Sequence, residues 1–242
     1  MICIIGGSGL ETIGKSRNQK VVKTPFGETT VETLSVNNKE FLFLSRHGKN
    51  HQTPPHKINY RANIWALKEC NVKQILATAA VGSLKLSFKP GMFGIVSQFI
   101  DFTKNRESTF FDSFEKGLQH TDMSNPYSEQ MNLLLEEAFL KFKYPFDTNL
   151  VLVVTEGPRF ESSAEIKAYT VLGGDVIGMT GYPEVALANE LSIPYSCMAI
   201  CSNFAAGITN QPLSHEEVIH TIDQLKESIT YTLVYFIENS FC

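Results

Sequence analysis

This chain of 242 residues lacks several features that would place it in a special class of protein. It has five cysteines, an odd number without a C-x-x-C pair, and a single tryptophan. No apolar run approaches the length of a membrane span, and the opening MICIIGG has neither the basic region nor the cleavage site of a secretory signal. We therefore expect a reduced, cytoplasmic protein with no membrane association.

Charge and metal-ligand patterns are equally sparse. The formal net charge is −4, which argues against the basic surface of a nucleic-acid-binding protein. No cluster of His, Cys, Asp and Glu has the spacing of a metal site, so we expect no metal. Hydrophobic residues make up 43% of the chain, and there are no repeats, linkers or low-complexity tracts. Residues 1–242 therefore predict one globular α/β domain.

The stretch from Val153 to Glu190 contains two strand–loop–helix units. A buried strand at Val151–Val154 leads into a loop and then a helix from about Glu161 to Gly173. A second strand, Asp175–Met179, precedes a helix that starts near Pro183. In α/β sheets, ligands bind where such strands end. The polar and flexible side chains delivered to these ends are Arg159, Glu161, Met179, Thr180 and Glu184.

The rest of the chain also alternates between strands and helices. Expected strands are Met1–Ile5, a β-meander over 20–46, Gln74–Ala79, Gly94–Phe102 and Tyr195–Ser202. Expected helices are Tyr60–Cys70, a helix capped by Ser124–Pro126 that runs to about Phe142, and a long C-terminal helix after the capping box Ser214-x-x-Glu217. Residues 103–123 show no periodicity and predict a long loop, which in a compact domain is often functional.

Two glycine-rich motifs compete for the first loop, Gly6-Gly7-Ser8-Gly9. A dinucleotide fingerprint fails because Thr12 stands at its third glycine. The spacing from Gly9 to Gly14-Lys15-Ser16 meets the nucleotide phosphate-loop pattern formally, but the residues between lack the composition of a phosphate cradle. An inorganic anion held by backbone N–H groups and the Ser8 hydroxyl is the favoured interpretation, with a plain tight turn as the alternative.

Several motifs together resemble one family. They are Ile4–Leu10, Arg46-His47-Gly48, Asn59–Asn63, Glu156–Glu161, Gly178-Met179-Thr180 and Pro183-Glu184. The set, in this order, resembles the trimeric purine nucleoside phosphorylases, which include methylthioadenosine and methylthioinosine phosphorylases. The resemblance implies a mixed, partly barrel-like β-sheet surrounded by helices. It implies phosphorolysis of a purine nucleoside to a free base and ribose 1-phosphate, with inorganic phosphate as co-substrate and no cofactor.

The resemblance also implies roles for individual residues. Phosphate is assigned to Ser8, Arg46, His47, Thr180 and the backbone of Ala80. Met179 is assigned to the sugar, Ala205 to the substrate site, and Glu161 and Asn203 to the base, with Asn203 and His47 as the catalytic residues. His215 is assigned to the 5′-hydroxyl, and His120 to a neighbouring subunit of a homotrimer, with a hexamer as the alternative. One departure is Ala79, where methylthioadenosine enzymes carry a hydroxyl.

The base contacts predict which purine is cleaved. A 6-oxopurine has an O6 acceptor and an N1–H donor, which match the amide N–H of Asn203 and the carboxylate of Glu161. Adenine reverses both polarities, so hypoxanthine and guanine nucleosides are favoured. The 5′ end is less constrained: His215 favours a 5′-hydroxyl, whereas the Pro-Pro-His loop at 54–56 and Asn203–Gly207 resemble methylthioinosine phosphorylases.

Three other functions remain possible on the sequence. A nucleoside hydrolase would break the same bond with water, a dinucleotide-dependent oxidoreductase would use the opening glycines, and a nucleotide-binding module would bind without cleaving.

Overall fold

A computed structural model describes residues 1–7, 14–48, 51–113, 115, 117, 119–211 and 213–240. Ser8 lies outside the described residues, as do the side chains of Ser16, Arg17 and His215. Within these described ranges no helix is long and apolar enough to cross a membrane.

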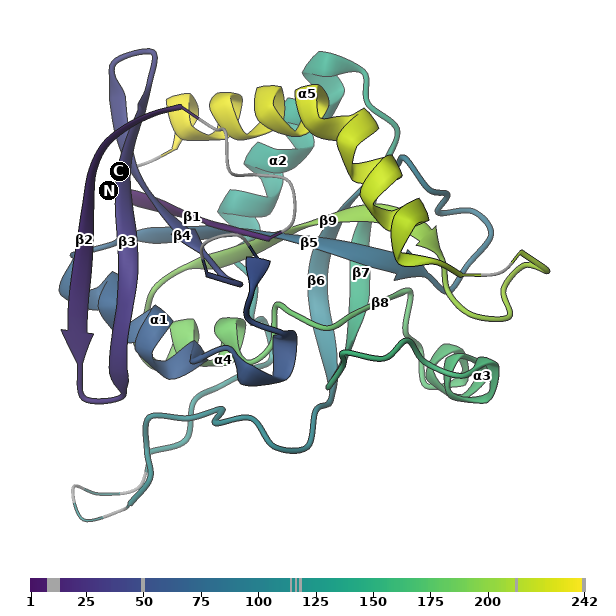
Figure 1. The fold of residues 1–242 in the computed structure, drawn as a ribbon, viewed down its shortest axis with the longest axis horizontal. Coiled ribbons are helices and arrows are strands. Elements are labelled where there is room, and N and C mark those ends of the chain that lie inside the picture. Colours follow the sequence, from purple (N-terminus) through teal and green to yellow (C-terminus); the bar gives the residue numbers. More distant parts are fainter. Residues whose placement is uncertain are drawn as a thin grey trace.

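The described elements alternate along the chain much as expected (Figure 1). The strands are β1 (Ile2–Gly6), β2 (Lys15–Thr24), β3 (Gly27–Val36), β4 (Lys39–Ser45), β5 (Gln74–Ser83), β6 (Phe93–Phe102), β7 (Phe146–Thr155), β8 (Val176–Gly178) and β9 (Tyr195–Phe204). The helices are η2 (Pro55–Lys57), α1 (Tyr60–Glu69), α2 (Glu129–Phe142), α3 (Ser163–Val171), α4 (Glu184–Glu190) and α5 (His215–Asn239).

Five strands close into a barrel. The hydrogen-bonded order β5–β8–β7–β6–β9 returns to β5, because β9 pairs with β5 in parallel from Ile75/Tyr195 to Ser83/Phe204. Strands β6, β7 and β8 are mutually parallel, and they run antiparallel to β5 and β9. The partly barrel-like, mixed sheet implied by the resemblance is therefore confirmed.

The remaining strands extend the sheet from β5. Strand β1 pairs in parallel with both β5 and β4, and the antiparallel meander β4–β3–β2 completes the sheet. This extension delivers the end of β4, and with it Arg46, to the same region as the end of β1. The backbone N–H of Arg46 donates to Gly6 O at 3.0 Å, which joins the two strand ends.

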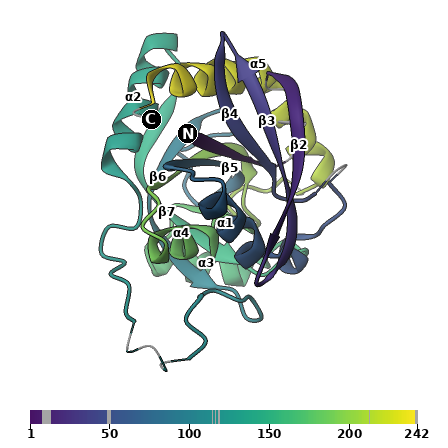
Figure 2. The ribbon, with the colours of Figure 1, turned by 90° about the vertical axis from the view of Figure 1, so that its left-hand side faces the viewer.

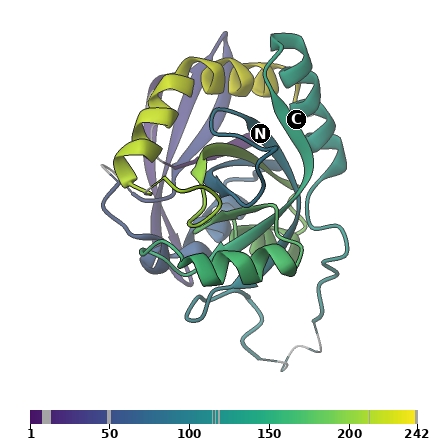
Figure 3. The ribbon, with the colours of Figure 1, turned by 90° about the vertical axis from the view of Figure 1, so that its right-hand side faces the viewer.

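Helices cover the sheet on two sides. Figure 2 shows α5 along the top and α2 at the upper left, with α1, α3 and α4 in the lower half. In Figure 3, α5 is again at the top and α3 at the bottom. Strand β1 explains this layering, because successive side chains point to opposite faces of a sheet. Cys3 and Ile5 join a core that includes residues of α1 and α4, whereas Ile2 and Ile4 join a core that includes residues of α2 and α5.

Close packing inside the barrel requires one glycine in particular. A Cβ on Gly94, near the start of β6, would lie 2.3 Å from Leu150 Cδ1 and 3.0 Å from Phe88 Cζ. Because interiors are packed without room for an additional atom, only glycine lets β6 approach β7 and β9 here.

Some predicted boundaries were wrong. Strand β5, expected to end at Ala79, continues to Ser83. Helix α2 is capped by Ser128, whose Oγ accepts from Met131 N, and not by Ser124–Pro126. Asp122 instead accepts from both the N–H and the hydroxyl of Ser124, which holds that residue in a turn. Elsewhere the expected caps are present, since Ser162 forms a capping box with Glu165 and Ser214 accepts from Glu217 N.

Candidate active site

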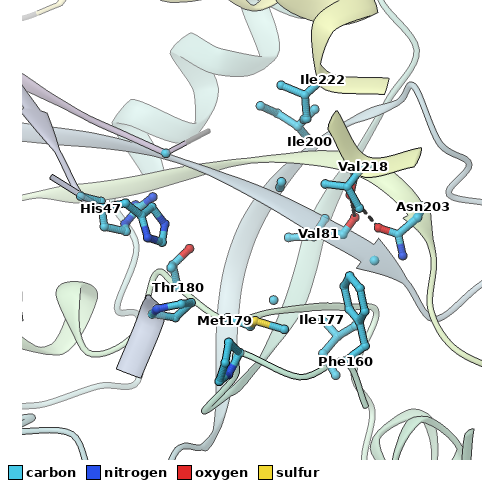
Figure 4. Close-up of a pocket in the computed structure, with 18 of the residues that line it drawn as sticks. His47, Val81, Phe160, Ile177, Met179, Thr180, Ile200, Asn203, Val218 and Ile222 are labelled. Atoms are coloured by element: carbon cyan, nitrogen blue, oxygen red, sulfur yellow. Dashed lines mark hydrogen bonds between the residues drawn. The ribbon is translucent and has the colours of Figure 1, made fainter. Parts of the chain in front are cut away.

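A cavity of about 490 Å³ opens where the ends of β4, β5, β8 and β9 meet the start of α5. Figure 4 shows His47 and Thr180 at one end, Asn203 and Phe160 at the other, and Met179 between them. The lining includes Arg46, His47, Thr53, Thr78, Ala80, Phe160, Glu161, Met179, Thr180, Ile200, Ser202, Asn203, Ala205, Leu213, Val218 and Ile222. The cavity therefore has an end with a buried cation, an end with an amide and a carboxylate, and an apolar side.

Most of the site residues expected from the sequence lie together in this cavity. They are Arg46, His47, Ala80, Glu161, Met179, Thr180, Asn203 and Ala205. His120 does not line the described cavity and is exposed in the loop after β6, so its expected role at a neighbouring subunit stays a prediction. Ala79 belongs to the core, while Thr78 and Ala80 line the cavity, because alternate residues of β5 point in opposite directions.

Arg46 is held by a buried carboxylate. Its Nε donates to Glu184 Oε1 at 2.5 Å and its Nη2 to Glu184 Oε2 at 2.9 Å, and its Nη1 donates to Thr78 O at 2.9 Å. Arg46 and Glu184 are 2% and 1% exposed, so this bidentate pair is out of contact with solvent. Burial lowers the pKa of Arg46, but the charge and hydrogen bonds of Glu184 outweigh this and raise it above its ordinary value. One N–H on each terminal nitrogen is left for a ligand.

His47 is a neutral ring of defined tautomer. Its Nδ1 lies 2.8 Å from Thr53 O, and because a carbonyl only accepts, Nδ1 carries the proton and Nε2 is the acceptor. Burial, and then the charge of Arg46, lower the pKa of His47 to about 4. The ring of His51 lies 4.0 Å away, centroid to centroid. Near neutral pH, His47 therefore adds no positive charge to this end of the cavity.

At the other end, Glu161 is anchored by Thr155. The Thr155 hydroxyl donates to Glu161 Oε1 at 2.5 Å, which leaves Oε2 for another donor. Burial raises the pKa of Glu161 above its ordinary value. Phe160 stands next to it with 38% of its surface exposed, so an aromatic face is available in the cavity.

Asn203 has an oriented amide. Its Oδ1 accepts from Ser202 Oγ at 2.7 Å (Figure 4). Its Nδ2 donates to Phe204 O at 2.9 Å, and this partner fixes the orientation of the amide because a carbonyl only accepts. One N–H and one lone pair remain for a ligand. Asn203 is only 4% exposed, so leaving either group without a partner in a closed site is costly.

Several residues of the site were missed in the sequence. The position of Glu184 at a strand end was noted, but its role as the partner of Arg46 was not. The signal was an acid directly before the apolar run Val185–Ala188, together with the need of a buried arginine for a counter-charge. Phe160 lies within the motif Glu156–Glu161 but was given no role. The apolar side formed by Ile200, Leu213, Val218 and Ile222 carries no local motif, because these residues converge only in three dimensions.

The barrel and its cavity define an α/β enzyme of the phosphorylase type. The family model described as "Phosphorylase superfamily" matches residues 1–238, and this chain belongs to that superfamily. The resemblance stated from the motifs is thereby confirmed.

Within this superfamily, the chain is similar to several purine nucleoside phosphorylases. The 6-oxopurine nucleoside phosphorylase of Pyrococcus furiosus is 46% identical over 234 residues, covering 94% of this chain and 88% of that protein. The probable S-methyl-5′-thioinosine phosphorylase of Methanocaldococcus jannaschii is 44% identical over 241 residues, covering 100% and 93%. The solved structure of methylthioadenosine phosphorylase from Schistosoma mansoni in complex with adenine superposes with a TM-score of 0.91 at 31% identity, over 98% of this chain and 90% of that one.

Proposed function

We propose that this chain is a 6-oxopurine nucleoside phosphorylase, which transfers the pentose of inosine or guanosine to inorganic phosphate. The observation that carries the proposal is the pairing of an oriented amide and a carboxylate in one cavity. Asn203 offers a donor and an acceptor, and Glu161 offers an acceptor, which matches O6, N7–H and N1–H of a 6-oxopurine. The 6-oxopurine nucleoside phosphorylase of Pyrococcus furiosus, at 46% identity, supports the same substrate class.

The proposal assigns the opposite end of the cavity to phosphate. Arg46 supplies two N–H donors, Thr180 a hydroxyl, and Nε2 of His47 accepts from a phosphate O–H. Because Glu184 balances the charge of Arg46, the anion is held mainly by aligned hydrogen bonds. Such a site can release phosphate to the sugar more readily than one with an uncompensated charge.

Cleavage follows from this arrangement of groups. As the glycosidic bond stretches, positive charge develops on the sugar and negative charge on the purine. The phosphate oxygen attacks the anomeric carbon, the C–N bond breaks, and the base departs with its electron pair. Asn203 stabilises that charge by donating to O6 and accepting from N7–H once this nitrogen is protonated. The residues' task is positioning and electrostatic stabilisation, since phosphate is itself the nucleophile.

The test is a panel of inosine, guanosine, adenosine and methylthioinosine, assayed with and without phosphate. We expect release of hypoxanthine or guanine together with ribose 1-phosphate, only when phosphate is present, and much slower turnover of adenosine. Undiminished cleavage without phosphate would instead identify a nucleoside hydrolase. Binding without release of base would identify a nucleotide-binding module.

A second candidate substrate is S-methyl-5′-thioinosine. The apolar side of the cavity, formed by Ile200, Leu213, Val218 and Ile222, suits a methylthio group better than a hydroxyl (Figure 4). The relative from Methanocaldococcus jannaschii supports this candidate. A kcat/KM for methylthioinosine above that for inosine would make it the preferred substrate.

We also propose that the active form is a homotrimer, with a hexamer as the alternative. The loop that carries His120 extends away from the body of the protein in all three views, so it is placed to reach a second subunit (Figures 1, 2 and 3). Light scattering gives the subunit number. An isolated monomer with full activity would contradict the proposal.

A further inference from the structure

Arg106 does not line the cavity, but its side chain is hydrogen-bonded to several of the segments that form it. Its side chain is 1% exposed, and it belongs to the segment that follows β6, residues 103–112, which we call the strap. Nη2 of Arg106 donates to Thr155 O at 2.9 Å, Glu156 O at 3.0 Å and Met179 O at 2.8 Å. Nη1 donates to Tyr182 O at 2.7 Å and to Tyr60 Oη at 3.2 Å.

These carbonyls belong to the segments that carry the three parts of the proposed substrate site. Thr155 ends β7 and bonds the Glu161 carboxylate through its hydroxyl. Met179 follows β8, lines the cavity itself and precedes Thr180. Tyr182 lies two residues before Glu184, which orients Arg46. A single guanidinium is thus hydrogen-bonded to the base, sugar and phosphate segments at once.

A guanidinium suits this position for geometric reasons. Its two terminal nitrogens carry four N–H groups in a fixed plane, and here they face four backbone carbonyls and a phenol oxygen. The Arg106 Nε lacks a hydrogen-bond partner among the described residues, and Glu156 Oε2 is 3.9 Å from it. A lysine has its three donors on a single atom, so it cannot reach all the carbonyls that the two terminal nitrogens of Arg106 reach.

We propose that Arg106 is a positioning residue for phosphorolysis, which fixes the base, sugar and phosphate segments relative to one another. The proposal rests on the proposed function for its assay. Each substrate contact would survive the loss of Arg106, but the contacts would no longer be aligned with one another. Because a misplacement of about 1 Å can reduce a rate by about 100-fold, the loss should appear in kcat more than in KM.

Arg61, in helix α1, provides a matched control because it binds the same strap from outside the cavity. It bonds Asp112 Oδ2 at 2.6 Å and Glu107 Oε2 at 3.0 Å, and these two acids are 61% and 71% exposed. Loss of Arg61 therefore loosens the strap from α1 without breaking the bonds between Arg106 and the strand ends.

The experiment compares the Arg106→Ala, Arg106→Lys and Arg61→Ala variants in the inosine assay, with inosine varied at saturating phosphate and phosphate varied at saturating inosine, alongside their thermal unfolding. For Arg106→Ala we expect kcat to fall by about 100-fold, with both KM values within about fivefold of wild type. Millimolar guanidinium should restore at least part of kcat in a saturable way, whereas sodium chloride and urea should not. Arg61→Ala should keep kcat within about threefold, since exposed ion pairs contribute little.

Arg106→Lys keeps the test decisive if Arg106→Ala does not fold. A folded lysine variant with kcat reduced about tenfold supports the proposal, because the charge is kept and only the fork is lost. A lysine variant within twofold of wild type, or equal losses in the Arg106 and Arg61 variants, would overturn it. So would an alanine variant whose activity falls only with its folded fraction. The wild-type assay is read first, so an absence of phosphate-dependent turnover would reject the proposed function and not the role of Arg106.

Discussion

Arg46 and Glu184 are 138 residues apart in the chain, yet their side chains form a buried, bidentate ion pair with Nε–Oε1 and Nη2–Oε2 distances of 2.5 and 2.9 Å. Tyr195 adds a third bond, since its hydroxyl donates to Glu184 Oε2 at 2.8 Å. The pair joins the end of β4 to the start of α4, and so it couples the stability of the fold to the anion end of the cavity.

Replacement of Glu184 by Gln should therefore destabilise the protein. Removing one partner of a buried ion pair leaves the other charge uncompensated and typically costs about 3–5 kcal/mol of unfolding free energy. Phosphate should recover more stability in this variant than in wild type, because the anion replaces the missing charge. Denaturant unfolding with and without phosphate measures both effects. The control is Glu190→Gln in the same helix, which can keep only one of the two bonds accepted from Thr109 and Phe110 but leaves Arg46 paired.

Asn203→Asp should shift the base preference toward 6-amino purines. A carboxylate cannot donate to O6 but can accept from the amino group of adenine, so the ratio of kcat/KM for inosine to that for adenosine should fall by about 100-fold. Steady-state rates for the two nucleosides test this. Asn189→Asp serves as the control, because that amide bonds Pro126 O and Val185 O outside the cavity. An unchanged ratio would remove Asn203 from base recognition.

As the pH is lowered, kcat/KM for inosine should begin to decline at a higher pH than it would if Glu161 had the ordinary pKa of a glutamate. Glu161 accepts from N1–H only when it is ionised, and burial raises its pKa. As pH falls through that raised pKa, kcat/KM declines. In the Glu161→Gln variant this decline of kcat/KM at low pH should disappear, while any decline due to protonation of phosphate itself remains. Identical profiles for the two proteins would contradict the assignment.

The His47 ring should make the fold less stable in mild acid. Its pKa is about 4 in the folded protein and near 6.5 when unfolded, so between these values the unfolded chain binds the extra proton. Stability attributable to this ring is complete above pH 6.5 and declines as pH falls toward 4. Between pH 7.5 and 4.5 wild type should lose about 2–3 kcal/mol more than His47→Gln. Denaturant midpoints across this range provide the measurement.

Two variants separate the candidate 5′ substituents. Val218→Thr puts a hydroxyl on the apolar side of the cavity, and should lower kcat/KM for methylthioinosine by about tenfold relative to inosine. His215→Leu should reduce turnover of inosine more than of methylthioinosine. Ile219→Thr, at an exposed position of the same helix, should leave the ratio unchanged. Equal losses for both substrates in the first two variants would exclude them from 5′ recognition.

Local patterns predicted most of the elements, and the family resemblance identified many of the residues that line the cavity. Apolar runs, glycines and caps are short-range signals. They were enough to locate the strand ends near Arg46, Thr180 and Asn203. The start of α2 was misplaced because Ser124 and Ser128 are both acceptable caps, and the choice was made by Asp122, which engages Ser124.

Long-range relationships could not be read in the same way. The bond between Arg46 and Glu184, and the five bonds of Arg106, depend on closure of the barrel, which brings distant segments together. The strap had the composition of an ordinary loop, and nothing in its local sequence distinguishes Arg106 from an exposed arginine. The orientation of the Asn203 amide likewise depends on its hydrogen bonds to Ser202 and Phe204 in the folded chain.

The proposed base contacts lie on different segments from the proposed phosphate contacts. Glu161 follows β7 and Asn203 lies in β9, whereas Arg46 and His47 follow β4 and Thr180 follows β8. Substitutions at Glu161 or Asn203 should therefore change which nucleobase is accepted without disturbing the residues proposed to bind phosphate. The specificity for the base could then change, in evolution or by design, through substitutions in one segment at a time while the barrel stays the same.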